Sequence, residues 1–367
     1  TIVYLGPMCL QDADMRPEFW SKRQKASGTN NPRNPYRIAD YYRVAPEYGT
    51  EDDLRAFVAE AHRLDLRVLL DLVYFHCGPT SVLIDRPGFI KRDASNNIST
   101  GNWNFPVLNF ESPEVREYFW DNMEFWVREF DVDGYRCDVA DMIPLPFWEE
   151  ARTRLDALRP GLVLLAEGQR REDQLRAFDV DYGFTWYNAL AAVGKKGSPA
   201  VSLRTTWEEM SQSRPKGNRF IRYTENHDIV NDLQRADVVF SRNGANAVSV
   251  LNFTMDGVPF LYNGQEIGDT TVQSIFARYP IRWEAACLPE SQARLAFYKK
   301  LCRLRRNEPV LVTGEMVWLD NDNPDAVVSF LRRSSEGHII CVINLSNRHA
   351  AASVALGEGA SEAYTPL

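Results

Sequence analysis

The sequence predicts an α/β protein in which a (β/α)8 TIM-type barrel is followed by a small antiparallel β domain. Over residues 1–306, short apolar runs alternate with amphipathic helical patterns, which is typical of a parallel sheet. The run "RVLLDLV" at 67–73 is apolar almost throughout, as a strand covered on both faces requires. From residue 309 onward, short strand-like runs are separated by Asn, Asp, Gly and Ser, which indicates antiparallel strands. We therefore expect a barrel at 1–306 and a β domain at 309–367.

Seven segments ahead of the β domain have the composition of barrel strands, whereas a (β/α)8 barrel needs eight. Either this count misses one strand, or the chain begins at the second strand and the first βα unit is missing. Seven strands would leave two open hydrogen-bonding edges, which favour aggregation. We therefore expect that a separate N-terminal segment supplies the first strand, or that another element covers the gap. The seven segments are 1–6, 67–73, 132–137, 162–167, 177–181, 219–224 and 258–262.

Three longer segments have the apolar spacing of amphipathic helices, at 50–66, 112–130 and 291–306. Thr50 and Ser112 stand where helix N-caps are expected, and a proline follows Ser112 in the first helical turn. The residues expected to face the core are Leu54, Phe57, Val58, Ala61 and Leu64 in the first helix and Val115, Phe119, Trp126 and Phe130 in the second.

Composition excludes several classes of partner and informs the compartment. The net charge of −8 and the pI near 5.3 argue against nucleic acid and against an anionic membrane surface. No apolar run has the length of a membrane-spanning helix, and no signal peptide is visible, although a removed leader stays open as an alternative. The six cysteines lack CxxC or zinc-like spacing, so we expect free and mostly buried thiols, which favours a reducing, cytoplasmic compartment.

Polar side chains stand where the predicted strands end. In a barrel, the carboxyl ends of the strands form the active-site face. The residues here include carboxylates, histidines and one arginine, without a phosphate-binding loop or a nucleophile elbow. Paired carboxylates are what cleavage of a glycosidic bond requires. These strand-end residues are Asp71, His76, Arg136, Asp138, Glu167, His227 and Asp228.

Arg136 and Asp138 raise a specific question, because they point the same way if they lie on one strand. A buried carboxylate beside a guanidinium is costly unless the two groups serve each other. A structural ion pair is the simplest interpretation of the two residues alone. Glu167 and the "NHD" segment at 226–228, at equivalent strand ends, favour a catalytic pair instead.

Four motifs together resemble those of the α-amylase family, glycoside hydrolase family 13. They are "DLVYFH" (71–76), "GYRCD" (134–138), the glutamate of "LLAEG" (Glu167) and "NHD" (226–228), in the family's order. Further similarities lie in "YLGPM" (4–8), "PYRIADYYRVAPEYGT" (35–50), "FPVLNF" (105–110) and "GVPFLYNGQEIG" (257–268). The resemblance covers about residues 1–306, and the family's usual C-terminal module fits the predicted β domain.

The resemblance implies roles for individual residues. Asp138 would be the nucleophile, Glu167 the general acid and base, and Asp228 a third carboxylate that holds sugar hydroxyls. Arg136 would orient Asp138 and keep it ionised, because a nearby cation lowers the pKa of a carboxyl group.

Other strand-end residues would contact the sugar or support the site. The resemblance implies that His76 and His227 hydrogen-bond the sugar, that Tyr36 stacks on its ring and that Asp71 helps to hold Arg136. Trp103 and Trp186 are candidates for sugar stacking, while we interpret Cys137, Asp141 and Asp181 as structural.

The sequence departs from the family pattern where many members bind Ca²⁺. Position 75 is phenylalanine where the family motif has an asparagine ligand, and phenylalanine offers no oxygen to a hard cation. The segment 77–104, where the family inserts an extra domain after its third strand, is short. We therefore predict no metal site and no cofactor.

These observations predict a retaining glycosidase that acts on α-glucosidic bonds of oligo- or polysaccharides through a covalent glycosyl-enzyme intermediate. The expected ligand is an α-glucan or maltooligosaccharide. The alternatives are a transglycosylase or sugar isomerase with the same residues, and a catalytically silent carbohydrate-binding or scaffold protein. A retaining mechanism predicts that the carboxyl groups of Asp138 and Glu167 lie roughly 5–5.5 Å apart.

Overall fold

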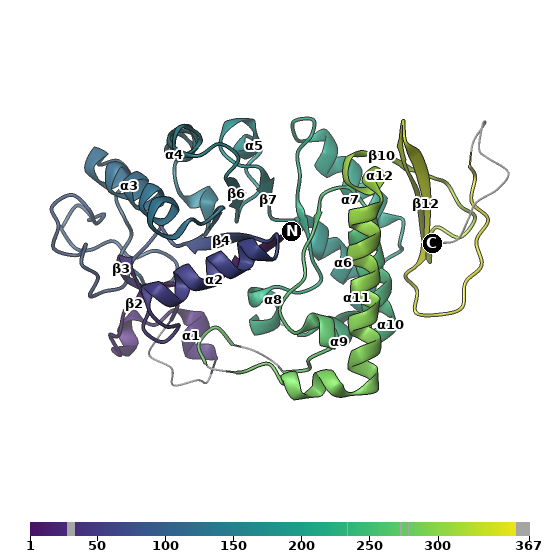
Figure 1. The fold of residues 1–367 in the computed structure, drawn as a ribbon, viewed down its shortest axis with the longest axis horizontal. Helices are drawn as coiled ribbons and strands as arrows, with labels where there is room; N and C mark the ends of the chain where they lie inside the picture. Colours follow the sequence, from purple (N-terminus) through teal and green to yellow (C-terminus); the bar gives the residue numbers. More distant parts are fainter. Residues whose placement is uncertain (28–33, 233, 272–273, 278, 357–367) are drawn as a thin grey trace. The chain divides into compact units, whose positions relative to one another are not determined.

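The structure is a computed structural model that describes residues 1–27, 34–232, 234–271, 274–277 and 279–356 (Figure 1). The chain divides into two compact units, Thr1–Tyr182 with Ser274–Arg278 and Gly183–Gln273 with Tyr279–Leu367. This division cuts across the predicted barrel, and the domain boundary predicted near residue 306 stays a prediction. None of the helices in the described ranges is both long and apolar enough to span a membrane.

The first unit is built on a five-stranded parallel sheet in the order β1-β4-β5-β6-β7. Residues of β4 are buried on both faces, as the apolar run predicted. The register sets Asp71 of β4 opposite Arg136 of β5, and Arg136 opposite Leu165 of β6. The strands are β1 (Ile2–Leu5), β4 (Arg67–Leu72), β5 (Gly134–Cys137), β6 (Val163–Ala166) and β7 (Val180–Asp181).

Helices between successive strands are anchored on this sheet by their apolar faces. Helix α2 (Glu51–Arg63) begins with a capping box between Thr50 and Asp53, so the predicted N-cap is confirmed. Helix α3 (Pro113–Phe130) buries all four predicted core residues. The other helices of this series are α4 (Leu145–Leu158) and α5 (Asp173–Arg176), with a short 3-10 turn, η2 (Ala140–Met142), before α4.

The predicted core face of α2 is too wide at two positions. Leu54, Val58 and Ala61 are buried, but Phe57 is 43% exposed and Leu64 is 53% exposed. The buried residues follow one another at helical spacings of four and three, which leaves Phe57 at the border of the stripe. Leu64 is the C-cap residue, so it lies beyond the last helical turn.

Segments outside the sheet fold back over its carboxyl edge. Strands β2 (Cys9–Gln11) and β3 (Ile38–Val44) pair antiparallel, and the chain between them forms η1 (Pro17–Phe19) and α1 (Lys22–Ala26). After β4, isolated bridges join His76 to Val107 and Ile90 to Leu108. The short segment 77–104 therefore returns to the end of β4.

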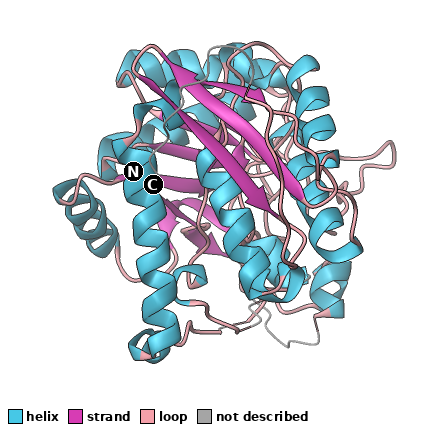
Figure 2. Cartoon of the chain, turned by 90° about the vertical axis from the view of Figure 1, so that its right-hand side faces the viewer, coloured by secondary structure: helices cyan, strands magenta, loops and turns pink. Residues whose placement is uncertain are grey.

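The second unit combines helices with two small sheets, whose strands Figure 2 shows in magenta. Strands β8 (Ile221–Arg222) and β9 (Val258–Pro259) form a parallel pair, and β10 (Glu315–Trp318), β11 (Val327–Ser334) and β12 (Gly337–Asn344) form the predicted antiparallel sheet. The helical elements are α6 (Phe184–Lys196), α7 (Ser202–Gln212), α8 (His227–Asp232), α9 (Ala236–Phe240), α10 (Arg242–Thr254), η3 (Gln265–Ile267), η4 (Trp283–Cys287), α11 (Pro289–Asn307) and α12 (Pro309–Thr313).

All seven predicted strands are present in the predicted order, although β7, β8 and β9 have only two residues each. Five lie in one sheet and two in another, and β1 pairs only with β4 among the described strands. The origin of an eighth strand stays a prediction. All six cysteines are free, and four of them are buried, as expected.

Candidate active site

A single buried arginine gathers three carboxyl groups at the ends of β4, β5 and β6. Arg136 Nη1 donates to Asp71 Oδ1 at 2.7 Å and to Asp138 Oδ1 at 2.7 Å. Its Nη2 forms an ion pair with Glu167 Oε2 at 2.9 Å. The guanidinium is fully buried, and the Asp138 and Glu167 side chains are 7% and 11% exposed. Neighbouring parallel strands end side by side, which brings these four residues together.

Two tyrosines complete the contacts of Asp71. Tyr36 donates its hydroxyl to Asp71 Oδ2 at 3.2 Å, and Tyr4 donates to the same oxygen at 2.8 Å. Tyr4 lies inside the predicted first strand, at 1–6, and the sequence alone assigned it no role. Tyr182 was also missed, and its ring lies 5.5 Å from the Arg136 guanidinium carbon. Position was the available signal, because Tyr4 is the last residue but one of β1 and Tyr182 follows β7 directly.

The electrostatic balance in this cluster differs from the expectation for Asp138. Burial raises the pKa of Asp138 well above its usual value, and the charges of Glu167 and Asp71 add to that increase. Arg136 lowers this pKa, as predicted, but burial outweighs that effect, and the statement that Arg136 keeps Asp138 ionised stays a prediction.

Arg136 itself remains a cation. Burial opposes its charge, but the carboxylates of Asp71 and Glu167 raise its pKa well above the usual value. One guanidinium faces three buried carboxyl groups here, and the repulsion from Glu167 and Asp71 adds to the increase that burial causes in the pKa of Asp138.

A strained backbone residue follows Asp138. Val139 has φ 38° and ψ 47°, a left-handed conformation that is costly for a β-branched side chain. Its N–H donates to Glu167 Oε2 at 2.7 Å, the same oxygen that Arg136 binds. Within the described ranges, Glu167 Oε1 and Asp138 Oδ2 form no hydrogen bond. Each carboxyl group is therefore held by one oxygen and presents the other.

The loop after β6 keeps Glu167 in place through a structural aspartate. Asp141 accepts from the N–H groups of Gln169 at 2.8 Å and Arg170 at 3.3 Å. A Cβ at Gly168 would lie 2.4 Å from Asp141 Oδ1, so any larger residue at that position would displace the aspartate. The side chain of Asp141 thus supports the loop backbone.

His76 lies four residues after the end of β4 in an aromatic environment. Its Nε2 meets the carbonyl of Tyr36 at 3.0 Å, so this nitrogen carries the hydrogen. Burial lowers the pKa of His76 to about 4, which makes the ring neutral at pH 7. The rings of Phe105 and Trp103 lie 4.9 Å and 5.5 Å from it. Trp103 therefore stays a candidate for sugar stacking.

His227 and Asp228 belong to the second unit, where they begin α8 just after β8. His227 Nε2 lies 3.4 Å from Asp228 Oδ2, and the Asp228 side chain is 29% exposed. Asn226 accepts from the N–H of Ile229 at 2.8 Å and so fixes the start of the helix. The grouping of Asp228 with Asp138 and Glu167 stays a prediction.

Trp186 does not qualify as a sugar-stacking residue, so that prediction is wrong. Its ring is fully buried, and its Nε1 donates to Asn252 Oδ1 at 3.0 Å. The apolar face of α6 carries Trp186 into the core of the second unit.

The described residues contain no group of three or more histidine, cysteine, aspartate or glutamate side chains arranged to hold a metal ion. Asp71, Asp138 and Glu167 instead direct oxygens toward Arg136, whose positive charge would repel a cation there.

Comparison with known proteins places these motifs in a wider context. The family model described as "Alpha amylase, catalytic domain" matches residues 2–87 and 98–291, which is more than half of the chain. The match is interrupted within the short segment 77–104 that follows β4.

Curated relatives and solved structures agree with this match. "Alpha-amylase 2" of Dictyoglomus thermophilum is 25% identical over 345 residues, covering 85% of this chain and 58% of its own length. "Maltogenic alpha-amylase" of Bacillus acidopullulyticus is 27% identical, covering 85% of this chain and 57% of its own length. This chain thus spans less than three-fifths of these relatives. The structure of a noncanonic maltogenic alpha-amylase from Thermotoga neapolitana has a TM-score of 0.82 at 30% identity, covering 94% of this chain and 77% of its own.

Proposed function

Because the chain belongs to the alpha-amylase family, we propose that it is a retaining glycosidase that cleaves α-glucosidic bonds through a covalent glycosyl-enzyme intermediate. The observation that supports this proposal is the pair of Asp138 and Glu167 bound to one buried guanidinium. Both carboxyl groups present an oxygen that no hydrogen bond within the described ranges occupies.

In the proposed first step, Glu167 donates a proton to the leaving oxygen while Asp138 Oδ2 attacks the anomeric carbon. The bond from that carbon to the leaving oxygen breaks, and an ester to Asp138 forms. This step requires Glu167 to carry a proton and Asp138 to be ionised when the sugar binds. Arg136 and the N–H of Val139 hold Glu167 Oε2, which leaves Oε1 to carry the proton.

In the second step, Glu167 takes a proton from water, and the resulting hydroxide displaces Asp138 from the sugar. The anomeric configuration is inverted twice and so retained. Asp228 would hold sugar hydroxyls as positive charge develops on the ring. This mechanism predicts a separation of roughly 5–5.5 Å between the carboxyl groups of Asp138 and Glu167.

We infer that maltooligosaccharides and cyclodextrins are the best substrates to test first. Relatives that match this chain include an intracellular maltogenic amylase of Bacillus subtilis and a cyclomaltodextrinase of Thermoanaerobacter pseudethanolicus. His76, Tyr36 and Trp103 offer hydrogen-bonding and stacking groups beside Asp71, and His227 would contact the sugar next to Asp228.

Product analysis tests the proposal directly. The protein is incubated with cyclodextrin, maltooligosaccharides, maltose, sucrose and trehalose, and the products are followed by proton NMR, which reports the anomeric configuration. Release of α-anomeric glucose or maltose is expected. A rearranged disaccharide would favour a transglycosylase or isomerase, first release of the β-anomer would contradict retention, and no product from any sugar would favour a silent binding protein.

Members of this family have a TIM barrel followed by a C-terminal β domain. We infer that the five-stranded sheet is part of such a barrel and that a further strand covers the edge of β1 that faces away from β4. Amide hydrogen exchange tests whether another strand covers this edge of β1. Slow exchange of the β1 N–H groups that face away from β4 is expected, and exchange at the rate of an unstructured peptide would contradict it.

A further inference from the structure

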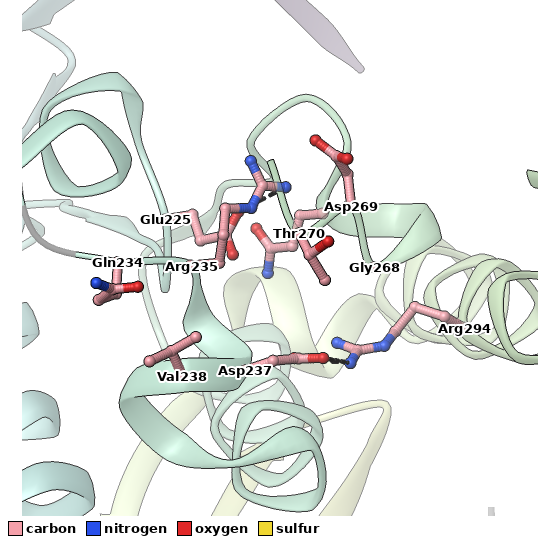
Figure 3. A pocket seen from close by; sticks show the side chains of 10 residues that line it. Glu225, Gln234, Arg235, Asp237, Val238, Gly268, Asp269, Thr270 and Arg294 are labelled. Atoms are coloured by element: carbon pink, nitrogen blue, oxygen red, sulfur yellow. Dashed lines mark hydrogen bonds and ion pairs between the residues drawn. The ribbon is translucent and has the colours of Figure 1, made fainter. Parts of the chain in front are cut away.

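A buried ion pair in the second unit closes the loop that carries Asp228. Glu225 follows β8 and accepts the N–H of Ala236, the first residue of α9, at 2.6 Å. Its other oxygen, Oε2, lies 3.2 Å from Arg235 Nη2, and both side chains are 3% exposed. Figure 3 shows the two side chains directed toward each other. One carboxylate therefore joins the residue before Asn226 to the residues that begin α9.

Arg235 also contacts the turn after β9. Its guanidinium carbon lies 6.0 Å from the centre of the Tyr262 ring. A Cβ at Gly264 would lie 3.3 Å from Arg235 Nη2 and 3.2 Å from Asp269 Cβ, so this glycine leaves room for the arginine. Gly264 has φ 88°, which also favours glycine. The arginine of the ion pair is thus packed against this turn.

We propose that Glu225 and Arg235 are positioning residues that hold the segment bearing His227 and Asp228 in its reactive place. This inference rests on the function proposed above, because it gives Asp228 a role in binding sugar hydroxyls. Asn226 already fixes the first turn of α8 through the N–H of Ile229. The Glu225–Arg235 pair fixes the two ends of the segment relative to each other, which reduces the conformations open to it.

Burial and charged groups from several elements together determine the protonation of Glu225. Burial raises the pKa of Glu225 to about 7, against the opposing effects of Arg235 and the Ala236 N–H. Asp237 of α9 and Arg294 of α11 pair with each other at 2.6 Å and line the same pocket, together with Asp269. Glu225 is therefore ionised and able to pair with Arg235 mainly above pH 7.

The test compares wild type with Glu225→Gln, which keeps an oxygen for the Ala236 N–H but loses the charge that binds Arg235. We expect kcat/KM to fall by about 10- to 100-fold at pH 8, because small misplacements of a reacting group have large kinetic effects. The loss should shrink toward zero as the pH falls through 7, because the wild-type carboxyl group then also becomes neutral. The matched control is Glu315→Gln, which disrupts an exposed pair with Arg333 at 2.9 Å in the same unit and should change kcat/KM less than twofold.

A double-mutant cycle separates positioning from general support of the fold. The affinity for acarbose is measured in wild type, Glu225→Gln, Asp228→Asn and the double variant. If Glu225 acts through Asp228, the Glu225 substitution should have no further effect once Asp228 is changed. Additive losses would overturn the proposal, and so would a folded Glu225→Gln with wild-type affinity and kcat/KM. Should Glu225→Gln fail to fold, Arg235→Lys replaces it in the same cycle with the same criteria.

Failure of the positioning role can be distinguished from failure of the proposed glycosidase function. A wild-type protein that cleaves none of the sugars contradicts the glycosidase itself. An active wild type whose Glu225→Gln variant is unaffected contradicts only the positioning role.

Discussion

Two buried arginines, one in each compact unit, bind carboxyl groups in different ratios. Arg136 contacts three carboxyl groups, from Asp71, Asp138 and Glu167, whereas Arg235 pairs with one, Glu225. In the first arrangement, burial and the repulsion from the neighbouring carboxylates raise the pKa of Asp138 despite the nearby cation. The second is balanced and joins two backbone segments. We infer that a buried guanidinium serves the proposed proton transfer in the first unit and the proposed backbone positioning in the second.

The largest expected effect comes from replacing either of the two proposed catalytic carboxyl groups that contact Arg136. Asp138→Asn and Glu167→Gln should each reduce kcat by about 10²–10⁴-fold or more, because each removes the nucleophile or the transferable proton at nearly constant volume. Initial rates on the best sugar and circular dichroism of the folded variants measure this. Glu111→Gln, which alters an exposed pair with Lys91, is the control. Near-wild-type rates for either site variant would show that our role assignment is wrong.

Shortening each arginine to lysine sharpens the comparison. Lysine is a point charge without the forked geometry that holds several carboxylates. Arg136→Lys should lower the free energy of unfolding by about 3–5 kcal/mol, as expected when a buried charge network is broken. Arg235→Lys should cost less, since one carboxylate needs only one partner. Urea denaturation gives both values, and equal losses would remove the distinction between the two sites.

The buried imidazole beside the Arg136 cluster predicts a pH-dependent stability. The pKa of His76 is about 4 in the folded protein, whereas the ordinary value of 6.5 applies to the unfolded chain. Between pH 4 and 6.5 the unfolded chain therefore binds more protons than the folded protein. The free energy of unfolding should therefore fall by about 3 kcal/mol as the pH drops from 6.5 to 4. His76→Gln should remove this part of the slope in urea denaturation at several pH values, and the exposed His338→Gln should not. An unchanged slope in His76→Gln would contradict the assignment.

Tyr4 is expected to have a smaller effect. Tyr4→Phe removes one of two tyrosine hydrogen bonds to Asp71 Oδ2, and Tyr36 keeps the other. A loss of about 1 kcal/mol in transition-state stabilisation is expected, seen as a several-fold lower kcat/KM. The matched control is Tyr42→Phe. The hydroxyl of Tyr42 donates to the Tyr118 carbonyl at 3.2 Å, and this substitution removes that hydrogen bond. An equal loss in both variants would mean that Tyr4 only supports the fold.

Chelation should have the smallest effect of all. Phe75 offers no oxygen ligand, so we expect EDTA to leave both the melting temperature and the rate unchanged. Differential scanning calorimetry with and without EDTA measures this. A marked fall in melting temperature that Ca²⁺ reverses would show that the chain binds the metal after all.

The sequence by itself determined which segments form the strands and which polar residues end them. The apolar run of β4, the N-cap at Thr50 and the order of the strands follow from local periodicity and composition, which depend on neighbouring residues only. The placement of Asp71, Asp138 and Glu167 at strand ends follows equally, because the carboxyl ends of parallel strands share one edge of a sheet.

Tertiary structure decided how those residues affect one another. The participation of Tyr4 and Tyr182, the burial of Trp186 and the exposure of Phe57 depend on which elements pack together, and residue spacing along one element does not contain that information. The pKa of Asp138 depends on a competition between desolvation and Arg136 that only the depth of burial resolves. Local sequence determines the elements and their polar ends, whereas protonation and contact arise from distances between residues far apart in the chain.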